Sequence, residues 1–147
     1  MTKAILAQFE AATKEFCTLA KAIPSEKLHV AAVQGEWPPA FAIHHLADLD
    51  AQFATRFLNI LTMENPGIVS FDEEIAPKAL DYEHRNPAIS LAAIEASCAF
   101  LVDLLEQVSP EAWNRTAVHP AKGKLTMSEL LAVTTDHRLG HLDQIRQ

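Results

Sequence analysis

Apolar residues recur along most of this chain at alternating spacings of four and three residues, which is the period of one buried face of an α-helix. The first such stretch predicts a helix over about residues 2–22. No stretch shows the alternation of apolar and polar residues that is typical of a half-buried strand. The pattern therefore favours an all-α fold. The stripe of the first helix consists of Ile5, Phe9, Ala12, Phe16, Leu19 and Ile23.

Prolines and a capping motif mark where three further helices begin. Pro39 and Pro87 suit the first turn of a helix, where an N–H has no partner in any case, so we expect helices over about residues 39–64 and 87–107. Thr126 and Glu129 have the spacing of a capping box, which predicts a fourth helix from there to the end of the chain. The third helix is expected to bury the stripe Ile89, Ala93, Ala96, Phe100, Leu104 and Leu105.

The stretches between these helices lack a sustained period. Residues 65–86 contain Pro66, Pro77 and an acidic run, so we expect a long surface crossover with room for one helical turn. The connection before the fourth helix is expected to hold a short turn with Trp113 and then a loop. Together these elements predict a four-helix bundle with long crossovers. One hydrophobic core suffices for a chain of this length, so residues 1–147 are expected to form a single domain.

The charge balance limits the partners of the chain. Twelve Lys and Arg against nineteen Asp and Glu give a net charge of −7, so there is no positive field to bind phosphates or anionic lipids. We therefore expect no nucleic-acid partner. We also expect no membrane association, because neither a signal peptide nor a membrane-spanning run stands out. Cys17 and Cys98 are isolated within apolar helical patterns. Two isolated cysteines in such patterns indicate reduced thiols in the core and a cytoplasmic location.

Two histidines near the end of the chain indicate a metal site. His137 and His141 are four residues apart on the expected fourth helix, so their imidazoles lie one turn apart on one face, where they can bind one ion. Leu130 and Thr134 belong to the same face, which a bundle would bury. The alternative is that histidines late in a helix interact favourably with its negative end and bind no metal.

A third histidine favours the metal interpretation. His45 lies between Phe41 and Leu49 at four-residue spacings, on the apolar face of the second helix. A buried imidazole needs a hydrogen-bond partner or a metal, and one shared ion is more economical than three separate partners. His44 is rotated by about 100° from that face, so it is the weaker ligand candidate.

Several segments resemble the DinB superfamily. The resemblance is carried by residues 45–48, His-Leu-Ala-Asp, and most strongly by residues 136–146, Asp-His-Arg-Leu-Gly-His-Leu-Asp-Gln-Ile-Arg. Trp37 before the second helix and residues 119–126 before the fourth stand in an order similar to that of the family, so the resemblance covers almost the whole chain. It implies a four-helix bundle, frequent homodimers and a three-histidine site for a divalent ion. The ligands that it implies are His45, His137 and His141.

The resemblance leaves the reaction open, because characterised members include thiol-dependent S-transferases, a mycothiol-dependent isomerase and inferred metal-dependent hydrolases. Three neutral imidazoles leave at least one coordination position for water or substrate. An ion there would deprotonate a thiol into a nucleophile or activate water for hydrolysis. We expect thiol-dependent S-transferase-like chemistry on a small-molecule substrate, with a low-molecular-weight thiol as partner. A metal-dependent hydrolase and a non-catalytic metal- or ligand-binding bundle are the alternatives.

Further expectations concern the ion, a carboxylate and the oligomer. Nickel or zinc is expected, and three imidazoles also suit iron, manganese or copper. Asp72 in the acidic crossover is a candidate catalytic residue, because its carboxylate could accept a proton at the metal, although Asp72–Glu74 also fits an exposed acidic run. Arg56 and Arg138 are expected on exposed helix faces. A homodimer is expected, since an apolar stripe outside the core would pair two bundles.

Overall fold

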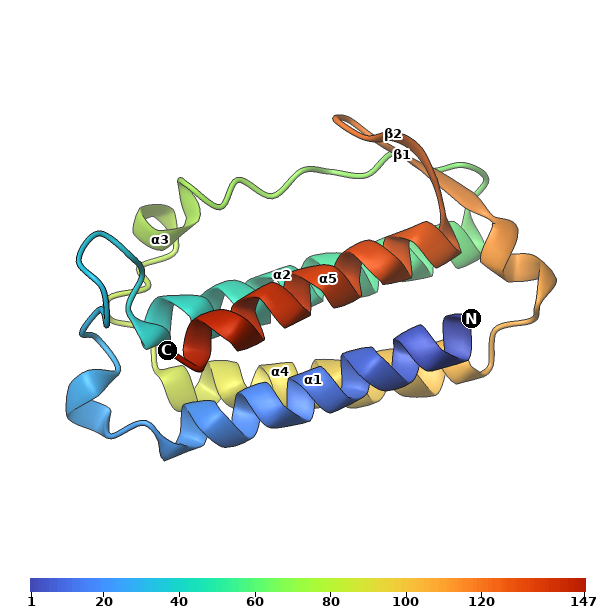
Figure 1. Ribbon diagram of the computed structural model, residues 1–147. Helices are drawn as coiled ribbons and strands as arrows, with labels where there is room; N and C mark the ends of the chain where they lie inside the picture. Colours follow the sequence, from blue (N-terminus) through green and yellow to red (C-terminus); the bar gives the residue numbers. More distant parts are fainter.

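The computed structural model describes residues 1–147 and contains four long helices (Figure 1). The expected all-α bundle is confirmed, and each helix begins and ends close to its predicted bounds. A single helical turn, α3, lies in the long crossover, as expected. The elements are α1 Thr2–Ala22, α2 Pro39–Thr62, α3 Ala76–Ala79, α4 Pro87–Glu106 and α5 Met127–Ile145, with strands β1 Thr116–His119 and β2 Gly123–Thr126 and 3-10 turns at Ser25–Lys27 and Glu111–Asn114.

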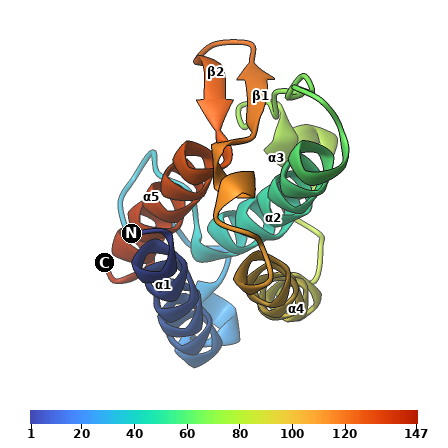
Figure 2. The ribbon, with the colours of Figure 1, turned by 90° about the vertical axis from the view of Figure 1, so that its right-hand side faces the viewer.

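The four helices form two parallel pairs that run in opposite directions. α1 lies beside α5, and α2 lies beside α4 (Figures 1 and 2). Because α2 and α4 point the same way, residues 63–86 must return along the bundle before α4 begins. This return segment runs along the outside of α2 and α5, which pack against each other.

Local signals fix the helix starts. Pro39 and Pro87 occupy the first turns of α2 and α4. At the start of α5 the Thr126 side chain accepts from the backbone N–H of Glu129 at 3.1 Å, and the Glu129 carboxylate accepts from the N–H of Thr126 at 2.7 Å. This reciprocal cap confirms the predicted capping box. Cys17 is a buried free thiol, and so is Cys98, which confirms the expectation of reduced core cysteines.

A short hairpin replaces the loop expected before α5. β1 and β2 are antiparallel, with Thr116 opposite Thr126 and His119 opposite Gly123. Gly123 has a φ of +73°, which glycine adopts without strain, and this permits the tight turn. Four-residue strands are too short for a clear alternation, so the sequence pattern missed them.

Most of the apolar stripe that α4 was expected to bury faces outward instead, and Leu105 is its one fully buried residue. Ile89 is 69% exposed and Phe100 is 48% exposed. The prediction of the buried stripe was wrong because α4 is apolar on nearly every side. The spacing of its apolar residues therefore does not identify the face that packs inward. By length and composition α4 also resembles a membrane span, yet it packs against α1 and α2 within the bundle. Its buried residues are Ser90, Leu91, Ile94, Cys98, Leu101 and Leu105.

Candidate metal centre

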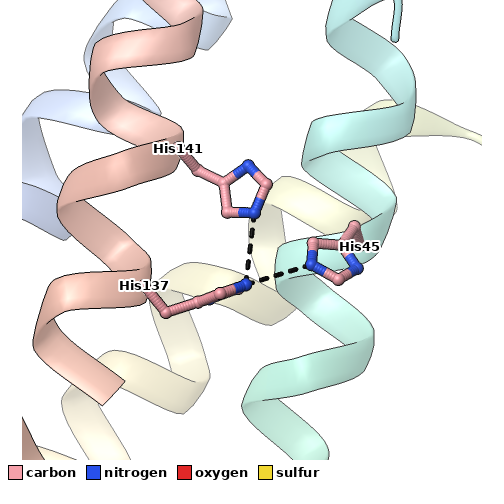
Figure 3. Close-up of side chains that lie close together, drawn as sticks. All are labelled: His45, His137 and His141. Carbon is pink, nitrogen blue, oxygen red and sulfur yellow. Dashed lines mark hydrogen bonds between the residues drawn. The ribbon is translucent and has the colours of Figure 1, made fainter. Parts of the chain in front are cut away.

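α2 and α5 bring three histidines together inside the bundle (Figure 3). His45 comes from α2, and His137 and His141 come from successive turns of α5. The Nε2 atom of His137 lies 3.1 Å from Nε2 of His45 and 3.2 Å from Nε2 of His141. All three ligand nitrogens lie within 4.8 Å of one another. The structure thus places the three sequence-predicted ligands around one point.

The spacing of these nitrogens suits a divalent ion. Two ligands bound tetrahedrally at about 2.0–2.1 Å lie about 3.3–3.4 Å apart, close to the separations of 3.1 and 3.2 Å seen here. Hydrogen bonds between the rings cannot account for both contacts of His137. Its Nε2 atom carries either one proton or one lone pair, but it has two nitrogen neighbours. A cation among the three lone pairs would satisfy all of them. The donor set therefore fits a metal ion.

Burial keeps the three imidazoles neutral. Together with repulsion between the clustered rings, burial lowers the pKa of His45 to about 4 and that of His137 to about 3. Burial also lowers the pKa of His141, against the opposing effect of its hydrogen bond to Gln144. Neutral imidazole is the form that binds a metal. At neutral pH the centre consequently has three free nitrogen lone pairs.

Neighbouring side chains orient the rings. Nδ1 of His141 donates to the Oε1 atom of Gln144 at 2.8 Å, which leaves the Nε2 lone pair directed at the centre. The rings of Trp37 and Phe71 pack near that of His45, with centroid distances of 5.1 and 6.2 Å. Sequence patterns place Trp37 before α2, but its contact with His45 depends on the tertiary fold.

His44, the weaker ligand candidate, points away from the centre. Its Nδ1 atom lies 2.7 Å from Oγ of Ser90 on α4, and its ring centroid is 5.5 Å from that of Tyr82. Burial lowers the pKa of His44 to about 4, so this imidazole is also neutral. Its hydrogen bond connects α2 to α4 and leaves the cluster to the other three histidines.

The acidic crossover places its carboxylates differently from the expectation. Asp72 uses Oδ1 to accept from the backbone N–H groups of Glu74 and Ile75, at 3.0 and 3.2 Å, so its side chain caps a turn. The next residue, Glu73, approaches the histidines, and its Oε2 atom lies 3.4 Å from Nε2 of His45. The sequence marked the acidic run, but only the turn decides which carboxylate reaches the centre.

Contacts at both ends of the crossover hold it over the centre. At its start, the N–H of Ile68 donates to the carbonyl of Val118 in the hairpin at 2.8 Å. At its end, Asp48 on α2 accepts from the hydroxyl of Tyr82 and from both terminal nitrogens of Arg85, each at 2.9 Å. The segment between these contacts is thereby fixed along α2.

A second buried contact between α5 and α2 is an ion pair that the sequence analysis missed. Arg138 is 1% exposed and forms a salt bridge with Asp50, which is equally buried. Burial raises the pKa of Asp50 to about 6, and the guanidinium of Arg138 opposes this rise. The expectation that Arg138 is exposed was wrong, because α5 packs on α1 and on α2 and has little free surface there. Arg138 directly follows His137 of the centre in the sequence.

A cavity of about 570 Å³ lies at the end of the bundle, and none of the three histidines lines it. Two of its lining residues also hold the histidines, because Trp37 packs on His45 and Gln144 accepts from His141. The remaining wall is largely apolar. It includes Leu19, Ile23, Val30, Pro39 and Ile145, with Lys27 and Glu36 as charged members.

Comparisons with known proteins show the family of this chain. A model of the DinB superfamily matches residues 8–145. OB0782 of Oceanobacillus iheyensis, an inferred metal-dependent hydrolase, is 32% identical over 121 residues, which cover 82% of this chain and 70% of the relative. YfiT of Bacillus subtilis, which carries the same description, is 28% identical over 114 residues, covering 77% of this chain and 64% of the relative.

Two solved structures share the fold. That of YfiT from Bacillus subtilis, described as a probable metal-dependent hydrolase with an unusual four-helix bundle topology, has a TM-score of 0.90 at 23% identity and covers 99% of this chain and 83% of its own. A mycothiol-dependent maleylpyruvate isomerase has a TM-score of 0.80 at 18% identity and covers 99% of this chain and 60% of its own. At these identities the likeness establishes the fold alone.

Proposed function

The chain belongs to the DinB superfamily, and from that premise we propose that it is an enzyme whose divalent metal ion is held by His45, His137 and His141. The observation that carries the proposal is the convergence of three neutral Nε2 atoms at separations suited to one ion. Nickel or zinc is the proposed ion, while iron, manganese and copper also accept imidazole ligands. The relatives that are described as metal-dependent support the same conclusion.

Thiol-dependent transfer is the proposed reaction class. When bound, a divalent ion supplies Lewis acidity, which lowers the pKa of a thiol or a water molecule that it binds. The chain itself contributes orientation, since Gln144 fixes the tautomer of His141 and Trp37 packs against His45. The largely apolar cavity lined by Trp37 and Gln144 offers space for the organic part of a small-molecule substrate. The isomerase with the same fold depends on a thiol cofactor, which supports a low-molecular-weight thiol as partner.

Metal-dependent hydrolysis is the second candidate, because OB0782 and YfiT carry that description. It would use the same three ligands, with water in place of the thiol. A non-catalytic bundle is the third, in which the ion would only rigidify the core. A cytoplasmic location also belongs to the proposal and is supported by the free thiols Cys17 and Cys98.

Cobalt-substituted protein separates these candidates. We would load the chain with Co²⁺, add 2-mercaptoethanol or glutathione, and record near-ultraviolet absorption. A sulfur-to-cobalt charge-transfer band in the unmodified chain, absent from His137→Ala, would support thiol activation. Cobalt binding without this band, together with hydrolysis of ester or amide substrates, would favour the hydrolase. Cobalt that binds neither thiols nor other exogenous ligands would indicate a structural ion.

A further inference from the structure

We propose that Glu73 is a fourth and displaceable ligand of the metal, an inference that rests on the proposed function of the three histidines. The Oε2 atom of Glu73 lies 3.4 Å from Nε2 of His45, the nitrogen that faces His137. This separation matches the value of about 3.3–3.4 Å expected between two ligands of one tetrahedral ion. The carboxylate thus lies beside the ligand nitrogen of His45 but outside the group of atoms within 4.8 Å of one another, so it would reach the ion by a rotation of its exposed side chain.

The turn that carries Glu73 is built to present its side chain. Asp72 caps the turn through the N–H groups of Glu74 and Ile75. Phe71, on the other side, packs against the ring of His45. Because the crossover is also fixed by its contacts with the hairpin and with Asp48, Glu73 remains near the centre without being buried.

Exposure distinguishes Glu73 from the three histidines. Its side chain is 62% exposed, whereas that of His45 is completely buried. A ligand held by one turn and facing solvent can leave the ion at little cost, while buried imidazoles on two packed helices cannot. Glu73 therefore completes the coordination before substrate arrives and gives up its position to an incoming thiol or water.

Glu74 offers a matched control, since it is the adjacent carboxylate and its backbone N–H belongs to the same turn. We would measure Zn²⁺ affinity by competition with a colorimetric chelator for the unmodified chain, Glu73→Gln and Glu74→Gln. The visible spectrum of the Co²⁺-loaded forms would report the ligand set. Glu73→Gln is expected to weaken Zn²⁺ binding about tenfold or more and to alter the cobalt spectrum. Glu74→Gln is expected to change neither.

Equal affinities and equal spectra for the two variants would overturn the role of Glu73 and leave the three-histidine site standing. An unmodified chain that binds neither Zn²⁺ nor Co²⁺ would contradict the proposed function itself. The two failures are therefore distinguishable.

Discussion

The Nε2 atoms of His45 and His137 lie 3.1 Å apart, although 92 residues separate them in the chain. The contact exists because α2 and α5 pack against each other, and His45 from α2 and His137 from α5 both point into the space between them. Both rings are neutral and have little freedom to move. Pre-organised ligands of this kind avoid an ordering cost when an ion binds.

The tautomer of His141 should control metal affinity. Gln144→Leu removes the oxygen that accepts from Nδ1, so the ring is free to place its proton on Nε2 and to rotate. We expect Zn²⁺ affinity to fall by about 10–100-fold in a chelator competition. Gln147→Leu is the control, since Gln147 is exposed and makes no side-chain contact with the histidines. Equal affinities for the two variants would rule out a positioning role for Gln144.

The buried pair of Arg138 and Asp50 should be sensitive to loss of one partner. Asp50→Ala leaves the guanidinium buried without a counter-charge, which should reduce the free energy of unfolding by about 3–5 kcal/mol in urea titrations. The double variant Asp50→Ala/Arg138→Leu should recover most of that loss, because it removes both charges. A double variant as unstable as Asp50→Ala would show that the charge is not the cause.

The metal-free protein should lose stability as the medium becomes acidic. In the unfolded chain histidines take up protons near pH 6.5, whereas His45 and His137 resist protonation until about pH 4 and about pH 3 in the folded state. The unfolded state binds more protons between these values, so the stability present above pH 6.5 is lost as the pH falls toward 4. Urea midpoints measured in a chelator at pH 7.5 and pH 5 test this. His137→Gln should show a smaller decrease, and an unchanged midpoint in the parent chain would contradict the account.

The capping box should contribute to the stability of the metal-bearing helix. Thr126→Ala removes the acceptor for the N–H of Glu129 and should cost about 1 kcal/mol, read as a lower thermal midpoint. Thr126→Ser keeps the hydroxyl and should lose much less. If both variants melt alike, the cap is not the stabilising element.

The parts of the fold with strong local signals could be predicted. Pro39, Pro87 and the Thr126–Glu129 cap act within one helical turn, so the sequence alone defines where the long helices begin. The same local periodicity placed His137 and His141 on one face of α5. It also placed His45 on the apolar face of α2, so all three histidines could be selected before their distances were known.

The remaining features depend on how the helices pack. The apolar character of α4 on nearly every side hid its inner face, so Phe100 was expected in the core and lies outside. Arg138 was expected in solvent because nothing local indicates its distant partner Asp50. Asp72 and Glu73 are adjacent acids, and only the backbone turn decides that the second approaches His45. Each of these depends on contacts between segments far apart in the chain.

The metal content of the purified chain shows whether the three histidines hold an ion. Chain purified without a histidine tag would be analysed by plasma mass spectrometry beside His137→Ala, with protein concentration measured independently. We expect close to one divalent ion per chain in the unmodified protein and its loss in the variant. An unmodified chain that holds no metal, even after nickel and zinc are supplied, would contradict the claim that these three histidines form a metal centre.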